Sequence, residues 1–321
     1  MTTHALNRRA PAPPPHPPEF DDPRLVVATA DLTKAFAGRT VVDSLDLRVP
    51  AGCVYGFLGP NGSGKSTTMK MLLGLLRPTR GRIRLFGTPV TRSNAITMMP
   101  RIGSMIERPP GYGHLTGAEN MAVVGRMLGL SGKQTDRALA LVRLTEHKNR
   151  LQRTYSLGMK QRLGIAMALA REPGLLVLDE PTNGLDPAGI EEIRELLVHL
   201  ASEGVSVMVS SHLLDEIDKM ASVLGILSAG RLVFQGTRAE LFARSLPDLF
   251  VSTPQVGEAL ALGVGGRRVP GGLLVPGLDQ AGAAWLIGAL VGHGITLYEA
   301  RRVEQSLEDV FMDLTGGAGA L

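Results

Sequence analysis

The feature that most constrains this chain is the glycine-rich segment GPNGSGKST at 59–67, which lies between two different apolar patterns. Before it, CVYGFLG (53–59) is a short continuous apolar run typical of a buried strand, and after it apolar residues recur at helical spacing over 69–76. A glycine, four variable residues, glycine, lysine and serine form the pattern of a phosphate-binding loop. A chance match is the alternative, but a preceding strand and a following helix are the context that such a loop requires.

The residue types in this loop suit a nucleotide phosphate. Backbone amides freed by the glycines would surround the β-phosphate, and the N-terminal end of the following helix would add positive potential. Lys65 would reach the β- and γ-phosphates, and Ser66 would give an oxygen to Mg²⁺. The predicted nucleotide-binding residues of the loop are Gly59, Pro60, Asn61, Gly62, Ser63, Gly64, Lys65, Ser66 and Thr67.

Two adjacent acids end the apolar run LLVLDE (175–180). Side chains alternate along a strand, so Asp179 can face a magnesium ion while Glu180 points toward the water that attacks the γ-phosphate. We therefore predict Asp179 as a metal ligand and Glu180 as the general base. A capped loop with solvated carboxylates is the alternative, and these two motifs alone leave kinases and GTPases open as well.

A third motif, YSLGMKQRLGIAMALA (155–170), narrows the choice. Ser156 is predicted to cap an apolar helix, whose exposed N-terminus would form a second phosphate site. At this point the sequence resembles the ATPase subunits of ABC transporters, with the signature written YSLGM where the usual form is LSGGQ. Leu157 and Met159 depart from that form. The resemblance covers about 25–246 and includes NGLDP (183–187).

The resemblance implies an α/β fold, the P-loop NTPase cassette of ABC proteins. It has a RecA-like parallel sheet core, an antiparallel β subdomain and a helical subdomain, here at about 107–165. Around this ATPase domain (25–246) we expect a disordered proline-rich tail at 1–24, containing PAPPPHPP, and a small C-terminal α+β accessory domain at 247–321. In that last segment the pattern predicts a helix over 281–291 and a strand over 295–300.

By the same resemblance, ATP with Mg²⁺ is bound, and Ser156 and Gly158 would contact the γ-phosphate held by an opposite subunit. Asp186 would lie at the dimer contact, and His212, after an apolar strand, would polarise the γ-phosphate. Phe36 would stack on adenine. A structural histidine is the alternative for His212, and a core phenylalanine is the alternative for Phe36.

Glu107 stands where the family usually has a glutamine that links Mg²⁺ and the attacking water to the membrane contact. It is predicted as a catalytic and metal-binding residue, with a solvated loop acid as the alternative. Together with SLGMKQR, a glutamate here resembles the bacitracin and lantibiotic exporter ATPases. That resemblance points to the export of a drug or antimicrobial peptide, hence to antibiotic resistance.

Composition limits the partners. The formal charge of +4 is small and scattered, so no nucleic acid is expected, and no segment reads as a membrane-spanning helix. The resemblance implies a second cassette, in a homodimer or heterodimer, and a separate polytopic membrane permease. We expect a cytoplasmic protein, peripheral at the inner face of the membrane through that permease. A soluble ABC ATPase acting on ribosomes or DNA, and an importer subunit, are the alternatives.

Overall fold

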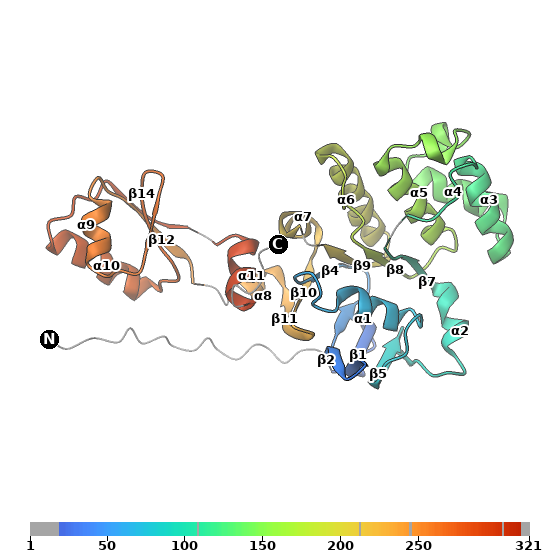
Figure 1. Ribbon diagram of the computed structural model, residues 1–321, viewed down its shortest axis with the longest axis horizontal. Coiled ribbons are helices and arrows are strands. Elements are labelled where there is room, and N and C mark those ends of the chain that lie inside the picture. The colour runs from blue at the N-terminus through green and yellow to red at the C-terminus, as the bar shows by residue number, and fades with distance from the viewer. Residues whose placement is uncertain (1–18, 108, 212, 244–245, 304, 316–321) are drawn as a thin grey trace. The chain divides into compact units, whose positions relative to one another are not determined.

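The computed structural model of the chain describes residues 19–315 except 108, 212, 244–245 and 304. These residues form two compact units (Figure 1). The larger unit runs from residue 19 to Arg238 and includes residues 314–315, and the smaller unit spans Ala239–Asp313. No helix in the described ranges is long and apolar enough to cross a bilayer.

A six-stranded sheet forms the centre of the larger unit, in the order β11-β10-β4-β9-β8-β7. Its neighbours pair in parallel except β10 with β11. All side chains of β4, β8 and β9 are buried, as expected for parallel strands that helices cover on both faces. The strands are β4 (Val54–Leu58), β7 (Ile102–Met105), β8 (Leu175–Asp179), β9 (Ser206–Ser211), β10 (Val223–Ser228) and β11 (Arg231–Thr237).

A second, antiparallel sheet packs against this core. Its order is β2-β1-β5-β6, and β3 pairs with β1. Val27 and Leu45 of this sheet share one hydrophobic cluster with Tyr55 and Phe57 of β4, so the two sheets are one structural body. The strands are β1 (Leu25–Phe36), β2 (Arg39–Leu45), β3 (Arg48–Pro50), β5 (Arg80–Leu85) and β6 (Thr88–Pro89).

Helices α3, α4 and α5 gather at one side of the larger unit (Figure 1, green). Helices α3 and α4 each begin at a capping box. The hydroxyl oxygens of Thr116 and Ser131 accept a hydrogen bond from the backbone N–H of the third helical residue, and the side chain of that residue, Glu119 or Gln134, accepts one from the backbone N–H of the cap. The helices of this unit are α1 (Lys65–Leu72), α2 (Ala95–Met98), α3 (Gly117–Leu128), α4 (Gly132–Leu141), α5 (Leu157–Leu169), α6 (Pro187–Ser202) and α7 (Leu214–Met220), with 3-10 helices η1 (Met99–Arg101), η2 (Thr145–His147) and η3 (Gln152–Thr154).

The smaller unit has a strand-helix-strand-strand-helix-strand order and an antiparallel sheet in which β12 lies between β14 and β15. This is the ferredoxin-like topology. Val251 and Leu273 of the sheet pack with Ala259 of α9 and Leu286 of α10 in a separate core. The elements are β12 (Asp248–Ser252), α9 (Val256–Ala261), β13 (Arg267–Val269), β14 (Gly272–Val275), α10 (Gln280–Gly292) and β15 (Glu299–Val303), flanked by α8 (Arg238–Ala243) and α11 (Leu307–Thr315).

The α/β fold class expected from the sequence is confirmed, but one strand is displaced. The strand predicted at 295–300 was wrong in its bounds, because β15 begins at Glu299. Ser252, the last residue of β12, pairs with Glu299, so the residues before Glu299 lie beyond the end of the partner strand. Ile295 instead enters the core of the smaller unit from a loop.

Candidate functional site

The glycine-rich loop connects β4 to α1, as its flanking patterns predicted. Gly64 caps α1 with φ 106°, and a Cβ atom there would lie 2.9 Å from the Val41 carbonyl oxygen. A Cβ atom on Gly59 would lie 2.5 Å from Ser63 Oγ. Side chains at these two positions would strain or block the loop, so the backbone keeps its close curvature only with glycine.

Two polar side chains of the loop are buried. Ser63 is 3% exposed, and its Oγ has no hydrogen-bond partner among the described residues. Lys65 is 7% exposed, and its Nζ donates to the carbonyl oxygens of Gly59 at 2.6 Å and Pro60 at 3.3 Å. Burial lowers the pKa of the Lys65 ammonium, although the nearby acids oppose that shift. An unsatisfied hydroxyl and a desolvated cation are the groups that an anionic phosphate would satisfy.

The predicted acids lie at the carboxyl end of β8. Asp179 is 6% exposed and accepts a hydrogen bond from Ser210 Oγ at 2.5 Å. The Glu180 backbone N–H donates to the same Ser210 Oγ at 3.0 Å, and Glu180 itself has φ 51°, in the left-handed region that non-glycine residues rarely adopt. Both carboxylates favour the charged form of Lys65, so all three groups share one electrostatic environment.

The donor set at this position suits a magnesium ion that also binds phosphate. No group of three or more His, Cys, Asp or Glu side chains that could enclose a metal occurs in the described part of the chain. Mg²⁺ in nucleotide sites takes one or two protein oxygens and completes its shell with phosphate and water. The hydroxyl of Ser66 and the carboxylate of Asp179 are hard oxygen ligands of that kind.

The signature and the NGLDP segment lie close together. Ser156 caps α5, with its Oγ accepting from the Met159 N–H at 3.2 Å, and Asp186 caps α6 by accepting from the Gly189 N–H at 3.1 Å. A Cβ atom on Gly184 would lie 3.0 Å from Leu157 Cδ2. The start of α5 is therefore packed against the loop that leads into α6.

Gly158 lies in the first turn of α5, and an added Cβ atom there would make ordinary contact with Leu185 at 3.8 Å. Phe36 ends β1, is 45% exposed, and has Lys34 Nζ 4.8 Å from its ring centroid. The alternative of a core phenylalanine is therefore wrong. His212 lies outside the described residues.

Glu107 follows β7 with φ 71°, and its Oε1 forms an ion pair of 2.6 Å with Lys70 Nζ. Its side chain is 66% exposed, as expected of a loop acid, but it is held by an ion pair with a lysine of α1.

The sequence patterns did not predict Lys70 or Ser210 as residues of the site. The signals were available: Lys70 stands four residues after Ser66, on the same helical face, and Ser210 is a polar residue near the end of an apolar strand.

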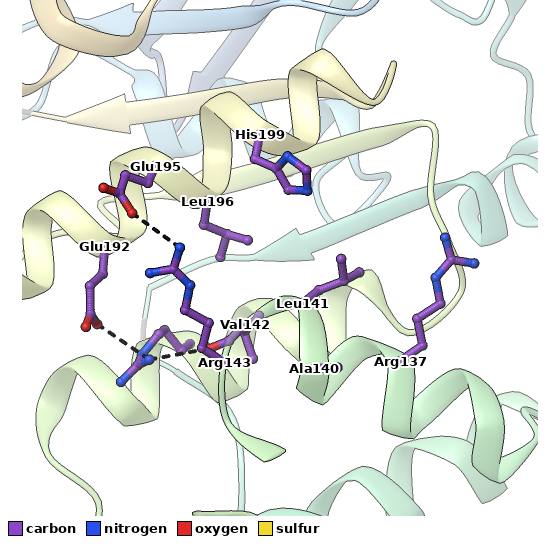
Figure 2. Close-up of a pocket in the computed structure, with 10 residues that line it drawn as sticks. Arg137, Ala140, Leu141, Val142, Arg143, Glu192, Glu195, Leu196 and His199 are labelled. Carbon is purple, nitrogen blue, oxygen red and sulfur yellow. Dashed lines mark hydrogen bonds and ion pairs between the residues drawn. The ribbon is translucent and has the colours of Figure 1, made fainter. Parts of the chain in front are cut away.

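A cavity of about 400 Å³ lies between α4 and α6, away from the loop (Figure 2). Ion pairs cross it to α6, at 3.4 Å from Arg143, which follows α4, to Glu195 and at 3.5 Å from Arg162 of α5 to Glu192. None of the predicted site residues lines it. The lining residues are Arg137, Ala140, Leu141, Val142, Arg143, Arg162, Glu192, Glu195, Leu196 and His199.

Comparisons with known proteins agree with this geometry. The ABC transporter family model matches residues 42–183. The chain is 39% identical over 301 residues to the bacitracin transport ATP-binding protein BcrA of Enterococcus faecalis, covering 92% of this chain and 97% of that protein. It is 43% identical over 205 residues to the lantibiotic transport ATP-binding protein SrtF of Streptococcus pyogenes, covering 64% and 88%. CbiO1 of Clostridium perfringens, part of an ABC transporter complex, superposes with TM-score 0.64 at 28% identity, covering 68% of this chain and 91% of that one.

A phosphate loop between a parallel strand and a helix, with an acidic strand end beside its lysine, defines a P-loop nucleotide-binding protein. The chain belongs to the family of ABC transporter ATP-binding proteins. The resemblance found in the sequence is thus confirmed, and the ATPase domain binds ATP.

Proposed function

We propose that this chain is the ATP-hydrolysing subunit of an exporter for a drug or an antimicrobial peptide, driving a separate membrane permease. The observation that carries the proposal is similarity along nearly the whole chain to a bacitracin transport protein. It extends past the cassette into the smaller unit, which a shared ATPase domain alone would not require. In this proposal the permease holds the chain at the cytoplasmic face of the membrane. Similarity to exporters disfavours both alternatives, an importer subunit and an ATPase acting on ribosomes or DNA.

In this proposal the loop fixes the triphosphate and the acidic strand end performs the chemistry. Lys65 and the Ser63 hydroxyl bind phosphate oxygens, and Ser66 and Asp179 hold Mg²⁺, which when bound neutralises charge on the β- and γ-phosphates. Glu180 orients a water molecule and accepts its proton as the water oxygen bonds to the γ-phosphorus. The bond from that phosphorus to the bridging oxygen breaks, and the electron pair leaves with ADP.

Completion of the site requires a second cassette. Ser156 and Gly158, at the N-terminus of the 13-residue helix α5, would face the γ-phosphate bound by the other chain. Asp186 would lie at the contact between the two cassettes. His212 would polarise the γ-phosphate, and Phe36, which is exposed at the end of β1, would stack on adenine.

Glu180→Gln is the direct test, because it removes the proton acceptor and keeps the shape of the side chain. We expect ATP binding to remain and steady-state hydrolysis to fall at least about 100-fold. Glu172→Gln is the matched control, since Glu172 is a surface acid paired with Arg137 at 2.8 Å. Normal turnover in the Glu180→Gln variant would refute the base assignment.

The transport assignment has its own test. We expect the tagged full-length chain to co-purify with a polytopic membrane protein from detergent-solubilised membranes. Recovery with ribosomes, and none in the membrane fraction, would refute it while leaving the ATPase assignment intact.

A further inference from the structure

The ion pair between Lys70 and Glu107 joins two segments that the ATPase mechanism uses separately. Lys70 lies in α1, the helix that starts at the phosphate loop, and Glu107 follows β7. Their Nζ and Oε1 atoms are 2.6 Å apart, and the side chains are 35% and 66% exposed. The contact therefore spans 37 residues of sequence and connects the loop helix to the start of the helical subdomain.

Helix geometry places Lys70 about one turn from Ser66, a proposed metal ligand. Ser66 and Lys70 are four residues apart in α1 and so lie on the same face, with a rise of about 6 Å along the axis. The residue that binds the Glu107 carboxylate thus starts about one helical turn from Ser66 on the same face of α1. Glu107 has φ 71°, a conformation that costs a non-glycine residue energy and needs contacts to maintain it.

The ion pair between Lys70 and Glu107 has an electrostatic role. Asp179 and Glu180 place two carboxylates beside Lys65, and in its proposed role as a metal ligand Glu107 would bring a third, where a glutamine would bring a neutral amide. Without a cation nearby, these negative charges repel one another and the incoming nucleotide. The Lys70 ammonium offsets the charge of Glu107, and a carboxylate engaged by an ammonium is a weaker ligand for Mg²⁺.

We propose that Lys70 is a positioning residue, which holds the Glu107 carboxylate beside the metal site and yields it to the cation when nucleotide and Mg²⁺ bind. This inference rests on the proposed role of Glu107 as a metal ligand. The lysine and the cation then compete for one carboxylate. The exchange connects metal occupancy to the position of the segment that begins the helical subdomain.

Because Lys70 and the metal ion compete for the Glu107 carboxylate, Lys70 should lower the affinity of the nucleotide-loaded chain for the metal ion. In the full-length chain saturated with the non-hydrolysable analogue AMP-PNP, Lys70→Met should bind Mn²⁺ about two- to fivefold more tightly, the range expected for loss of an exposed ion pair. Lys70→Arg should keep the wild-type affinity, because it keeps the ion pair. In a Glu107→Gln background, Lys70→Met should change Mn²⁺ affinity by less than about 1.5-fold, since the carboxylate is gone.

The measurement is Mn²⁺ titration followed by electron paramagnetic resonance, which requires no turnover. Lys148→Met is the control, because Lys148 pairs with Asp136 at 2.8 Å with side-chain exposures of 32% and 63%, nearly those of Lys70 and Glu107. This control should leave Mn²⁺ affinity unchanged. Thermal unfolding of each variant separates a change in metal affinity from a change in stability.

The outcomes distinguish this inference from the proposed function. If AMP-PNP does not bind to the wild-type chain, the ATPase proposal itself fails. If AMP-PNP binds but Lys70→Met leaves Mn²⁺ affinity unchanged, the positioning role of Lys70 is overturned. It is also overturned if Lys70→Met changes Mn²⁺ affinity equally in the wild-type chain and in the Glu107→Gln background.

Discussion

Ser210 donates its hydroxyl proton to Asp179 Oδ1 across 2.5 Å, between neighbouring strands of the central sheet. The same hydroxyl oxygen accepts the backbone N–H of Glu180 at 3.0 Å. Ser210 is fully buried, so solvent cannot replace either bond. One side chain therefore orients both the proposed metal ligand and the backbone of the proposed base.

Ser210→Ala should weaken Mn²⁺ binding to the nucleotide-loaded chain about 10- to 100-fold, the usual effect of removing a residue that orients a metal ligand. It should also cost about 1–3 kcal/mol of unfolding free energy, because a buried Asp179 oxygen loses its partner. Mn²⁺ titration and urea unfolding measure the two effects. Ser211→Ala is the control: Ser211 is as buried but contacts the Leu213 backbone, so stability should fall without a metal effect.

Ser156→Ala should separate a helix cap from a contact across the dimer. Ser156 and Ser131 both cap helices through their hydroxyl oxygens, so alanine at either position should cost about 1 kcal/mol of stability. Only the change at Ser156 should abolish ATP-dependent dimerisation in size-exclusion chromatography. If the alanine variants at Ser156 and Ser131 affected dimerisation equally, Ser156 would act only as a helix cap and not as a contact across the dimer.

The two ion pairs beside the cavity in Figure 2 should differ in their contribution to stability. Arg162 is mostly buried, with a side chain 15% exposed and an Nε that lacks a partner among the described residues, so Glu192→Gln should cost about 1–2 kcal/mol. Arg143 and Glu195 are 69% and 52% exposed, so Glu195→Gln should cost less than about 0.5 kcal/mol. Urea unfolding midpoints compare the two, and equal losses would contradict the argument from burial.

Cys53 should react slowly with iodoacetamide in the folded chain. Burial raises the pKa of its thiol from 9.0 to about 11, and the reactive form is the thiolate. At about pH 8 the folded thiol should therefore alkylate about 100-fold more slowly than in urea. Because the raised pKa lets the folded state keep a proton that the unfolded chain loses, stability should fall as pH rises from about 9 to 11. Similar labelling rates in buffer and urea would contradict this.

The local chemistry of the site was readable from the sequence, because each motif is continuous along the chain. The run GPNGSGKST predicted a strand, a loop and a helix, and the structure has them as β4, the loop and α1. LLVLDE likewise predicted a buried strand that ends in two acids, found as β8 followed by Glu180.

Contacts between distant segments were not readable. Ser210 lies 31 residues after Asp179, and Lys70 lies 37 residues before Glu107. Periodicity shows which face of an element is apolar, but not which element lies beside it. The ferredoxin-like order of the smaller unit was missed for the same reason, since β12 pairs with β14 and β15 across intervening helices.

The sequence by itself determined the phosphate loop, the acidic strand end and the capped signature helix, because local backbone preferences and apolar spacing specify each of them. Only the tertiary structure decided which side chains hold them in place: Ser210 on Asp179 and Lys70 on Glu107. Those pairs depend on strand order and helix packing, which are set by burial over the whole unit and by no single segment.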